Sequence, residues 1–209
     1  MKKYCIIFLL TLLSVTACRE NKKPNQDAKI SVSTYTLPIP KGWTTELFMI
    51  PISFAPEIPY KGVEDLRFSG GWGNAKSSEY WSYAFLWYLD SAVEINAGII
   101  EKNMASYYAG LIASNIEKRR IPADKIFPPK TSIEKIKTDA GDIETFQGTI
   151  YMLDYMEQKP ITLNCIVHLK SCSEKNKTFL FHEISPKPFT DSVWQTLNQL
   201  NKDLTCNQK

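Results

Sequence analysis

The sequence predicts an α+β domain in which a curved antiparallel β-sheet of about six to seven strands has two main helices packed on it. Three features support this class. Strand-like segments rich in β-formers precede a stretch with helical spacing, four alternating segments joined by short polar turns follow it, and an amphipathic helix comes last. The expected order is therefore strands, helix, meander, helix.

The first part of the chain holds four strand candidates, at residues 30–36, 43–50, 63–68 and 80–89. Prolines and glycines separate them and predict turns or extended loops. In residues 80–89 both alternating sets of side chains are apolar or aromatic. A strand of this kind is covered on both faces, which implies a three-layer or helix-backed sheet.

A helix is expected from Asn96, a plausible N-cap, to about Arg120, because Pro122 cannot continue it. The period then changes to two, and short polar turns between neighbouring strands predict an antiparallel meander. Gly148 is interpreted as a bulge within this meander. A last helix, capped by Thr190 or Asp191, reaches Leu204. The meander strands are residues 133–137, 143–155, 161–170 and 178–184.

This element order resembles the fold shared by the PsbP proteins of oxygen-evolving photosystems and the nuclear-transport factor Mog1. The resemblance lies in the order of elements alone, so it implies a fold and neither function. A second resemblance, to an uncharacterised family of bacterial envelope proteins, implies no known activity. It rests on residues 39–43, 54–60, 62–68 and 83–89.

The N-terminus has the pattern of a secretory signal. Lys2 and Lys3 precede an apolar run over residues 4–13, which is shorter than the roughly 20 residues a membrane-spanning helix needs. The following segment, Val15-Thr16-Ala17-Cys18, resembles the lipobox of bacterial lipoproteins. The alternative is an ordinary cleaved signal that happens to end at a cysteine.

The lipobox resemblance implies that residues 1–17 are removed and that Cys18 is acylated and holds the protein on a membrane. Residues 18–33, whose first part is wholly polar, are expected to form a flexible tether, and residues 34–209 a single globular domain. No aspartate follows Cys18. By analogy with lipoprotein sorting in Gram-negative bacteria, this favours the outer membrane over the inner membrane.

Charge argues against nucleic acid as a partner. The formal net charge is +3, and removal of Lys2 and Lys3 with the signal lowers it to +1. Nucleic-acid binding relies on clustered Lys and Arg, which this near-neutral domain lacks. The expected partners are therefore the membrane, through the lipid, and either an envelope protein or a small ligand.

Three cysteines remain in the domain, and an envelope location would allow a disulfide between two of them. Cys165 lies on the apolar side of an alternating run and is expected to be a buried thiol. Cys172 lies in a polar turn and Cys206 follows the last helix, so we predict a Cys172–Cys206 disulfide. The alternatives are three free thiols or a pairing that involves Cys165.

The most distinctive local composition lies at residues 57–81, where charged side chains occur among aromatic ones beside prolines and glycines. Such a set suits a ligand groove, for which Glu64, Arg67, Trp72 and Trp81 are the candidate residues. The alternative is a buried structural ion pair between Arg67 and Glu64 or Asp65.

Catalytic signals are weak. The two histidines, His168 and His182, have no zinc-ligand spacing, and neither a nucleophile elbow nor a phosphate loop occurs. One histidine is expected to be exposed and the other packed. The sequence therefore predicts a non-enzymatic binding or accessory module with no assigned catalytic residue, cofactor or metal. The alternative is an envelope hydrolase that uses His168 or His182.

Overall fold

The structure is a computed structural model that describes residues 34–172 and 176–207. The predicted signal peptide, the predicted lipid-anchor residue Cys18 and the predicted tether lie outside the described residues. In the described part of the chain, no helix is both long enough and apolar enough to cross a membrane.

Seven antiparallel strands form one sheet, in the order β2-β3-β4-β8-β7-β6-β5. The predicted meander is confirmed, since β5 to β8 pair consecutively. The polar turns between these strands are shorter than the crossover of about a dozen residues that a parallel connection needs, so neighbouring strands run antiparallel. The strands are β2 (Thr44–Ile50), β3 (Gly62–Phe68), β4 (Tyr83–Leu89), β5 (Lys130–Lys135), β6 (Glu144–Asp154), β7 (Lys159–Cys172) and β8 (Lys177–Ser185).

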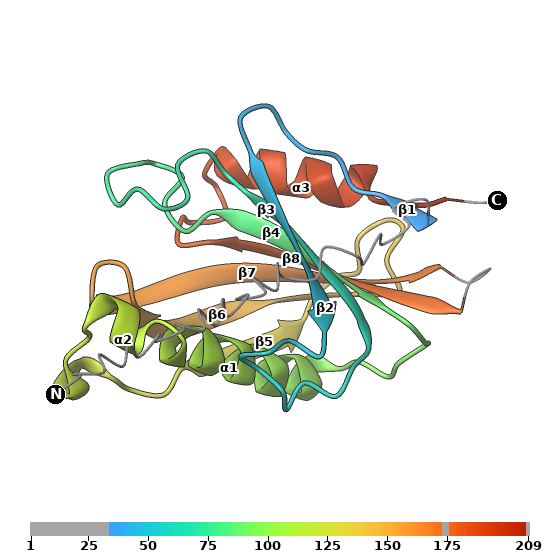
Figure 1. Cartoon of the computed structure of the whole chain (residues 1–209). Coiled ribbons are helices and arrows are strands. Elements are labelled where there is room, and N and C mark those ends of the chain that lie inside the picture. Colours follow the sequence, from blue (N-terminus) through green and yellow to red (C-terminus); the bar gives the residue numbers. More distant parts are fainter. Residues whose placement is uncertain (1–33, 173–175, 208–209) are drawn as a thin grey trace, which may run out of the picture. The chain divides into compact units, whose positions relative to one another are not determined.

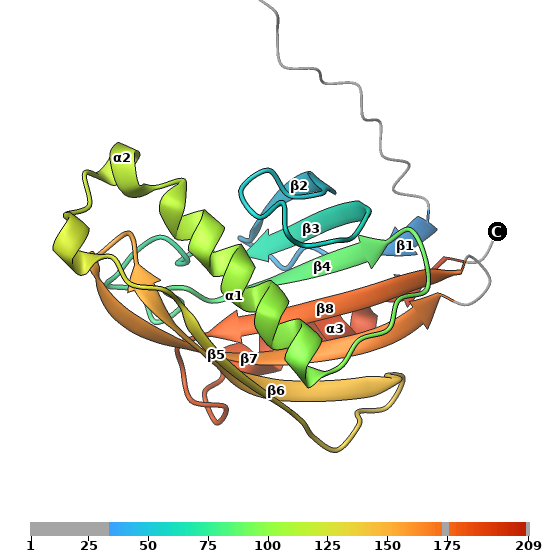
Figure 2. The same ribbon diagram turned by 90° about the horizontal axis from the view of Figure 1, so that it is seen from below.

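The two main helices cover opposite faces of the sheet (Figure 1). Helix α1 (Ala97–Ala113) packs on β5 and β6, and helix α3 (Val193–Asp203) packs on β8 and β4. Figure 2 shows α1 crossing the near face of the sheet with α3 behind it. Strand β4 is buried along its whole length. The predicted α+β class is therefore confirmed, with the sheet as the middle of three layers.

The helix boundaries follow their capping residues. Asn96 accepts a hydrogen bond from the Ile99 amide at 3.0 Å and starts α1. The single helix predicted to reach Arg120 is instead broken after Ala113, and a short α2 (Ile116–Arg119) follows. The N-cap of α3 is Ser192 and not Thr190 or Asp191 as predicted, although the Asp191 side chain accepts a hydrogen bond from the Val193 amide at 3.0 Å.

The bulge interpretation of Gly148 is wrong. Strand β6 pairs with β7 in unbroken register, and Gly148 lies opposite Cys165. A Cβ atom at this position would collide with the carbonyl oxygen of Ser132 on β5. Glycine is therefore used for close approach of two backbones, which a lone glycine in a strand pattern does not distinguish from a bulge.

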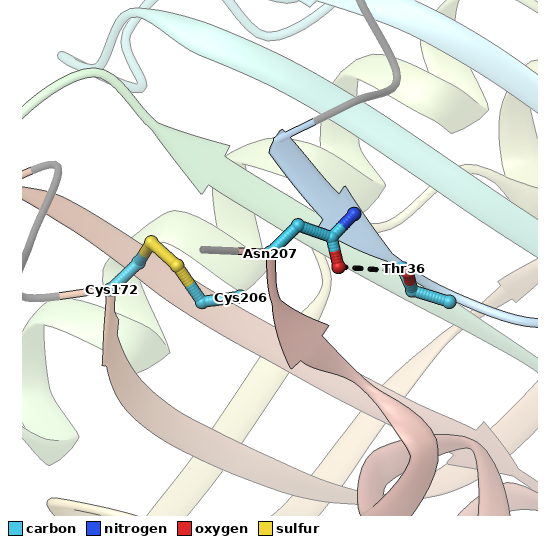
Figure 3. Close-up of a disulfide and its surroundings, with 4 residues drawn as sticks. All are labelled: Thr36, Cys172, Cys206 and Asn207. Atoms are coloured by element: carbon cyan, nitrogen blue, oxygen red, sulfur yellow. Dashed lines mark hydrogen bonds between the residues drawn. A yellow bond between two sulfur atoms is a disulfide. The ribbon is translucent and has the colours of Figure 1, made fainter. Parts of the chain in front are cut away.

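A second, two-stranded sheet ties the ends of the domain together. Strand β1 (Tyr35–Thr36) pairs with β9 (Thr205–Cys206), and Thr36 donates to the side chain of Asn207 at 2.9 Å. The predicted Cys172–Cys206 disulfide is confirmed and joins β7 to β9 (Figure 3). Cys165 is a free, buried thiol, as expected.

Candidate ligand-binding site

A cavity of about 250 Å³ lies between the β2–β3–β4 part of the sheet and helix α1. Eight of its lining side chains are aromatic, and only one carries a formal charge at neutral pH. The lining residues are Glu46, Phe48, Phe54, Leu66, Phe68, Trp72, Trp81, Tyr83, Tyr107, Leu111, Ser114 and Tyr155.

The sheet register places one wall of this cavity. Glu46 of β2 lies opposite Leu66 of β3, and Phe68 of β3 lies opposite Tyr83 of β4. Residues two apart on a strand share a face, so Leu66 and Phe68 both point to the α1 side. Glu46 and Phe48 are exposed on the edge strand, and the cavity meets solvent there.

The loop over residues 69–82 brings in the two tryptophans. The Trp81 amide donates to the Trp72 carbonyl at 3.0 Å, and the Ser69 amide donates to the Ser82 carbonyl at 3.3 Å. Trp81 has a φ of 55°, in the left-handed region that bulky residues seldom occupy. Such strained residues cluster at functional sites, where the surrounding contacts hold them in place.

Helix α1 and the loop before β3 form the opposite wall. The rings of Phe54 and Tyr107 lie 5.1 Å apart in an edge-to-face arrangement. A Cβ atom on Gly110 would collide with the Phe54 carbonyl oxygen, so this helix glycine allows the loop to approach. Phe54 and Tyr107 are not among the residues predicted for the site. Tyr107 lies within the predicted helix, but no local pattern indicates that this helix contacts the loop that carries Phe54.

Glu64 lies behind the cavity wall, fully buried on the same sheet face as Leu66. The Trp87 indole N–H donates to its Oε1 at 3.2 Å. Burial raises the pKa of Glu64 to about 7, against smaller opposing effects of Trp87 and Tyr107. Burial also raises the pKa of Tyr107, so this lining phenol stays neutral.

Arg67 points to the other face of the sheet and is buried. It forms an ion pair with Asp65 and donates to the carbonyl oxygens of Leu37 and Pro38 at 2.8 and 2.9 Å. Of the four predicted residues, Trp72 and Trp81 thus line the cavity, Glu64 adjoins it and Arg67 is separated from it. The contacts of Arg67 match the alternative, a buried structural ion pair with Asp65. A role for Arg67 in ligand binding stays a prediction.

The two histidines lie on opposite faces of the sheet, since His182 is opposite Val167 and His168 is opposite Phe181. His182 stacks on the ring of Phe85 at 4.1 Å, and burial lowers its pKa to about 3. The expectation that one histidine is exposed is wrong, because both are fully buried. Helix α3 covers the face of His168, and strand alternation alone does not indicate which faces helices will cover.

His168 is the centre of a buried polar network beneath α3. Its Nδ1 lies 2.7 Å from Asp142 Oδ2, and its Nε2 lies 3.2 Å from Glu183 Oε1, an ion-pair distance without good hydrogen-bond alignment. Asp139, Asp142 and His168 are close enough together to hold a metal ion. However, Lys170 Nζ lies 3.6 Å from Asp142 Oδ1 and already supplies a positive charge. We therefore interpret the cluster as an ion-pair network.

This network should make stability depend on pH. Burial alone would lower the pKa of His168, but the hydrogen bond to Asp142 and the charges of the Asp142 and Glu183 carboxylates outweigh it and raise the pKa from 6.5 to about 9. The folded state then holds the proton more tightly than the unfolded chain does. The stabilisation is complete below pH 6.5 and is lost as the pH rises through 9, a decrease of about 3 kcal/mol in the free energy of unfolding.

The measurement is urea unfolding of the wild type and of His168→Gln at a series of pH values. The difference between their free energies of unfolding should shrink between pH 6.5 and 9. Groups common to both proteins cancel in this difference. Two curves that fall in parallel over this range would show that His168 is not protonated in the folded state.

Comparison with known proteins adds no relationship. No protein-family model matches the chain, and no curated protein is similar to it at a significant level. The case for function therefore rests on the residues and geometry described above.

Proposed function

We propose that this protein is a lipid-anchored envelope lipoprotein that binds a small ligand in the aromatic cavity and is not an enzyme. The observation that carries the proposal is the cavity itself, built by four separate segments around Trp81 in a left-handed conformation. Its volume of about 250 Å³ is slightly below the usual range for drug-sized ligands, which favours a smaller molecule.

Two features support an envelope location. Val15–Cys18 resembles a lipobox, which would put lipid on Cys18. The Cys172–Cys206 disulfide suits an oxidising compartment outside the cytoplasm. The absence of aspartate after Cys18 favours the outer membrane. The element order supports a PsbP- and Mog1-like fold, and residues 39–43, 54–60, 62–68 and 83–89 support a place in an uncharacterised envelope family.

Binding is favoured over the alternative, an envelope hydrolase. A catalytic histidine needs one ring nitrogen available to substrate or nucleophile. Both nitrogens of His168 lie against carboxylates, and His182 is fully buried among aromatic rings. Neither histidine lines the cavity. The hydrolase alternative stays a prediction with less support.

The proposal can be tested with indole, a small neutral aromatic probe, on the full-length protein labelled with fluorotryptophan. The chain has five tryptophans. Fluorine NMR should show saturable shifts for Trp72 and Trp81, which line the cavity, while Trp43 and Trp194 keep their resonances. Tryptophan-to-phenylalanine variants assign the signals.

A blocking variant provides the control. Ser114 lines the cavity, so Ser114→Phe should abolish the indole shifts of the cavity tryptophans. Ser91 is also an exposed serine but does not line the cavity, so Ser91→Phe should leave the shifts unchanged. Absence of saturable shifts, or shifts that survive in folded Ser114→Phe, would refute the proposal.

A further inference from the structure

The electrostatic character of the cavity is one-sided. Glu46 is the only lining residue with a formal charge at neutral pH, and no Lys, Arg or His contributes to the lining. The three lining tyrosines remain neutral, since burial raises the pKa of Tyr83 and Tyr107 and raises that of Tyr155 to about 12. A ligand in this cavity therefore meets a single carboxylate and no cation.

The aromatic walls add to the same preference. The face of an aromatic ring carries partial negative charge and attracts cations within about 6 Å. The ring centroid of Trp72 lies 4.7 Å from that of Phe68 and 5.6 Å from that of Trp81, and all three residues line the cavity, so several aromatic rings border one small volume. Tyr155 already makes a contact of this kind with Arg119, which does not line the cavity and whose guanidinium carbon lies 5.1 Å from the ring centroid.

A second carboxyl group lies behind the wall. Glu64 is fully buried, and the lining residue Tyr107 is close enough to affect its ionisation. Buried carboxyl groups are costly to ionise without a partner, and the ion pairs found among the described residues include none for Glu64. A cation in the cavity would offset part of this cost.

We propose that the cavity binds a small organic cation of the quaternary or tertiary ammonium class, held by aromatic ring faces and by the carboxylate of Glu46. This inference rests on the proposed function and specifies its ligand class. Inorganic cations fit less well, because the lining offers one carboxylate and otherwise few oxygen ligands.

The test compares choline with its neutral carbon analogue, in which a tert-butyl group replaces the trimethylammonium group. The two probes have nearly the same shape, so the difference in their affinities reports charge. Using the fluorotryptophan signals of the full-length protein, we expect choline to bind about tenfold more tightly than the neutral analogue.

Two charge-removing variants distinguish the effect of a carboxylate in the cavity on choline affinity from the effect of the overall charge of the protein. Glu46→Gln should reduce the preference for choline severalfold and leave binding of the neutral analogue unchanged. Glu57 is exposed and does not line the cavity, so Glu57→Gln should keep the full preference.

The outcomes distinguish the two proposals. If indole binds but the protein has the same affinity for choline and for the neutral analogue, the cavity is a neutral apolar site. The inference of a cationic ligand is then wrong, while the proposed function stands. Equal loss of preference in the two glutamine variants would also refute the role of Glu46. If indole, choline and the neutral analogue all fail to shift Trp72 and Trp81, both proposals are wrong.

Discussion

Replacing Arg67 by methionine is expected to lower the free energy of unfolding by about 3–5 kcal/mol, the usual cost of breaking a buried ion pair from one side. Among the described residues, the change leaves the buried Asp65 carboxylate with only the hydroxyl of Tyr35 as a partner, at 3.0 Å. It also removes the donors to the carbonyl oxygens of Leu37 and Pro38, which join β1 to β2. Urea unfolding monitored by circular dichroism measures the loss.

An exposed ion pair provides the control. Lys135 and Glu144 lie 2.6 Å apart at the β5–β6 edge, and the Lys135 side chain is 54% exposed. Lys135→Met should therefore change stability by less than about 1 kcal/mol. Comparable losses in both variants would contradict a special role for the buried pair. If indole no longer shifts the fluorine signals of Trp72 and Trp81 in folded Arg67→Met, Arg67 contributes to the ligand site.

Removing the disulfide by a Cys172→Ala/Cys206→Ala double substitution should cost about 4 kcal/mol, since the bond closes a loop of 34 residues in the unfolded chain. The bond also attaches β9 to the end of β7, and β9 is the only strand that pairs with β1 in the described part of the chain (Figure 3). Urea unfolding, with amide hydrogen exchange at Thr36 and Thr205, measures the global and local effects.

Reductant distinguishes loss of the bond from loss of side-chain packing. The wild type should lose most of the 4 kcal/mol (about the loop-closure value) when reduced. The double variant should not respond, because the remaining Cys165 is free and buried. A wild type whose stability is the same with and without reductant would show that the bond does not constrain the unfolded chain.

Local sequence signals identified most of the elements but not all of their ends. The apolar character of β4 on both alternating sets correctly predicted cover on both faces, because a strand with no polar side needs two partners. Period-two alternation and short turns were sufficient for the meander. Helix α1 ends at Ala113, and the prediction extended it to Arg120 because the turn at Ser114 and Asn115 carries no proline or glycine to mark it.

The candidate site shows what local patterns leave open. Glu64 and Arg67 are three residues apart on one strand, so they must point to opposite faces. Proximity in sequence placed both residues in one predicted site, whereas Glu64 lies beside the cavity and Arg67 lies on the other face, near the segment that follows β1. Trp72 and Trp81 lie in one loop, which places their ring centroids 5.6 Å apart.

The sequence by itself determined the α+β class, the order of elements and the burial of Cys165, because each depends on local periodicity, turn length or polarity. It favoured the Cys172–Cys206 pairing but left other pairings open, and the structure decided among them. Only the tertiary structure decided which sheet face each polar side chain occupies and what covers it. Helix α3 buries His168, and α1 together with the Phe54 loop closes the cavity over β2 to β4. These arrangements depend on contacts between segments distant in the chain, whose packing no local pattern specifies.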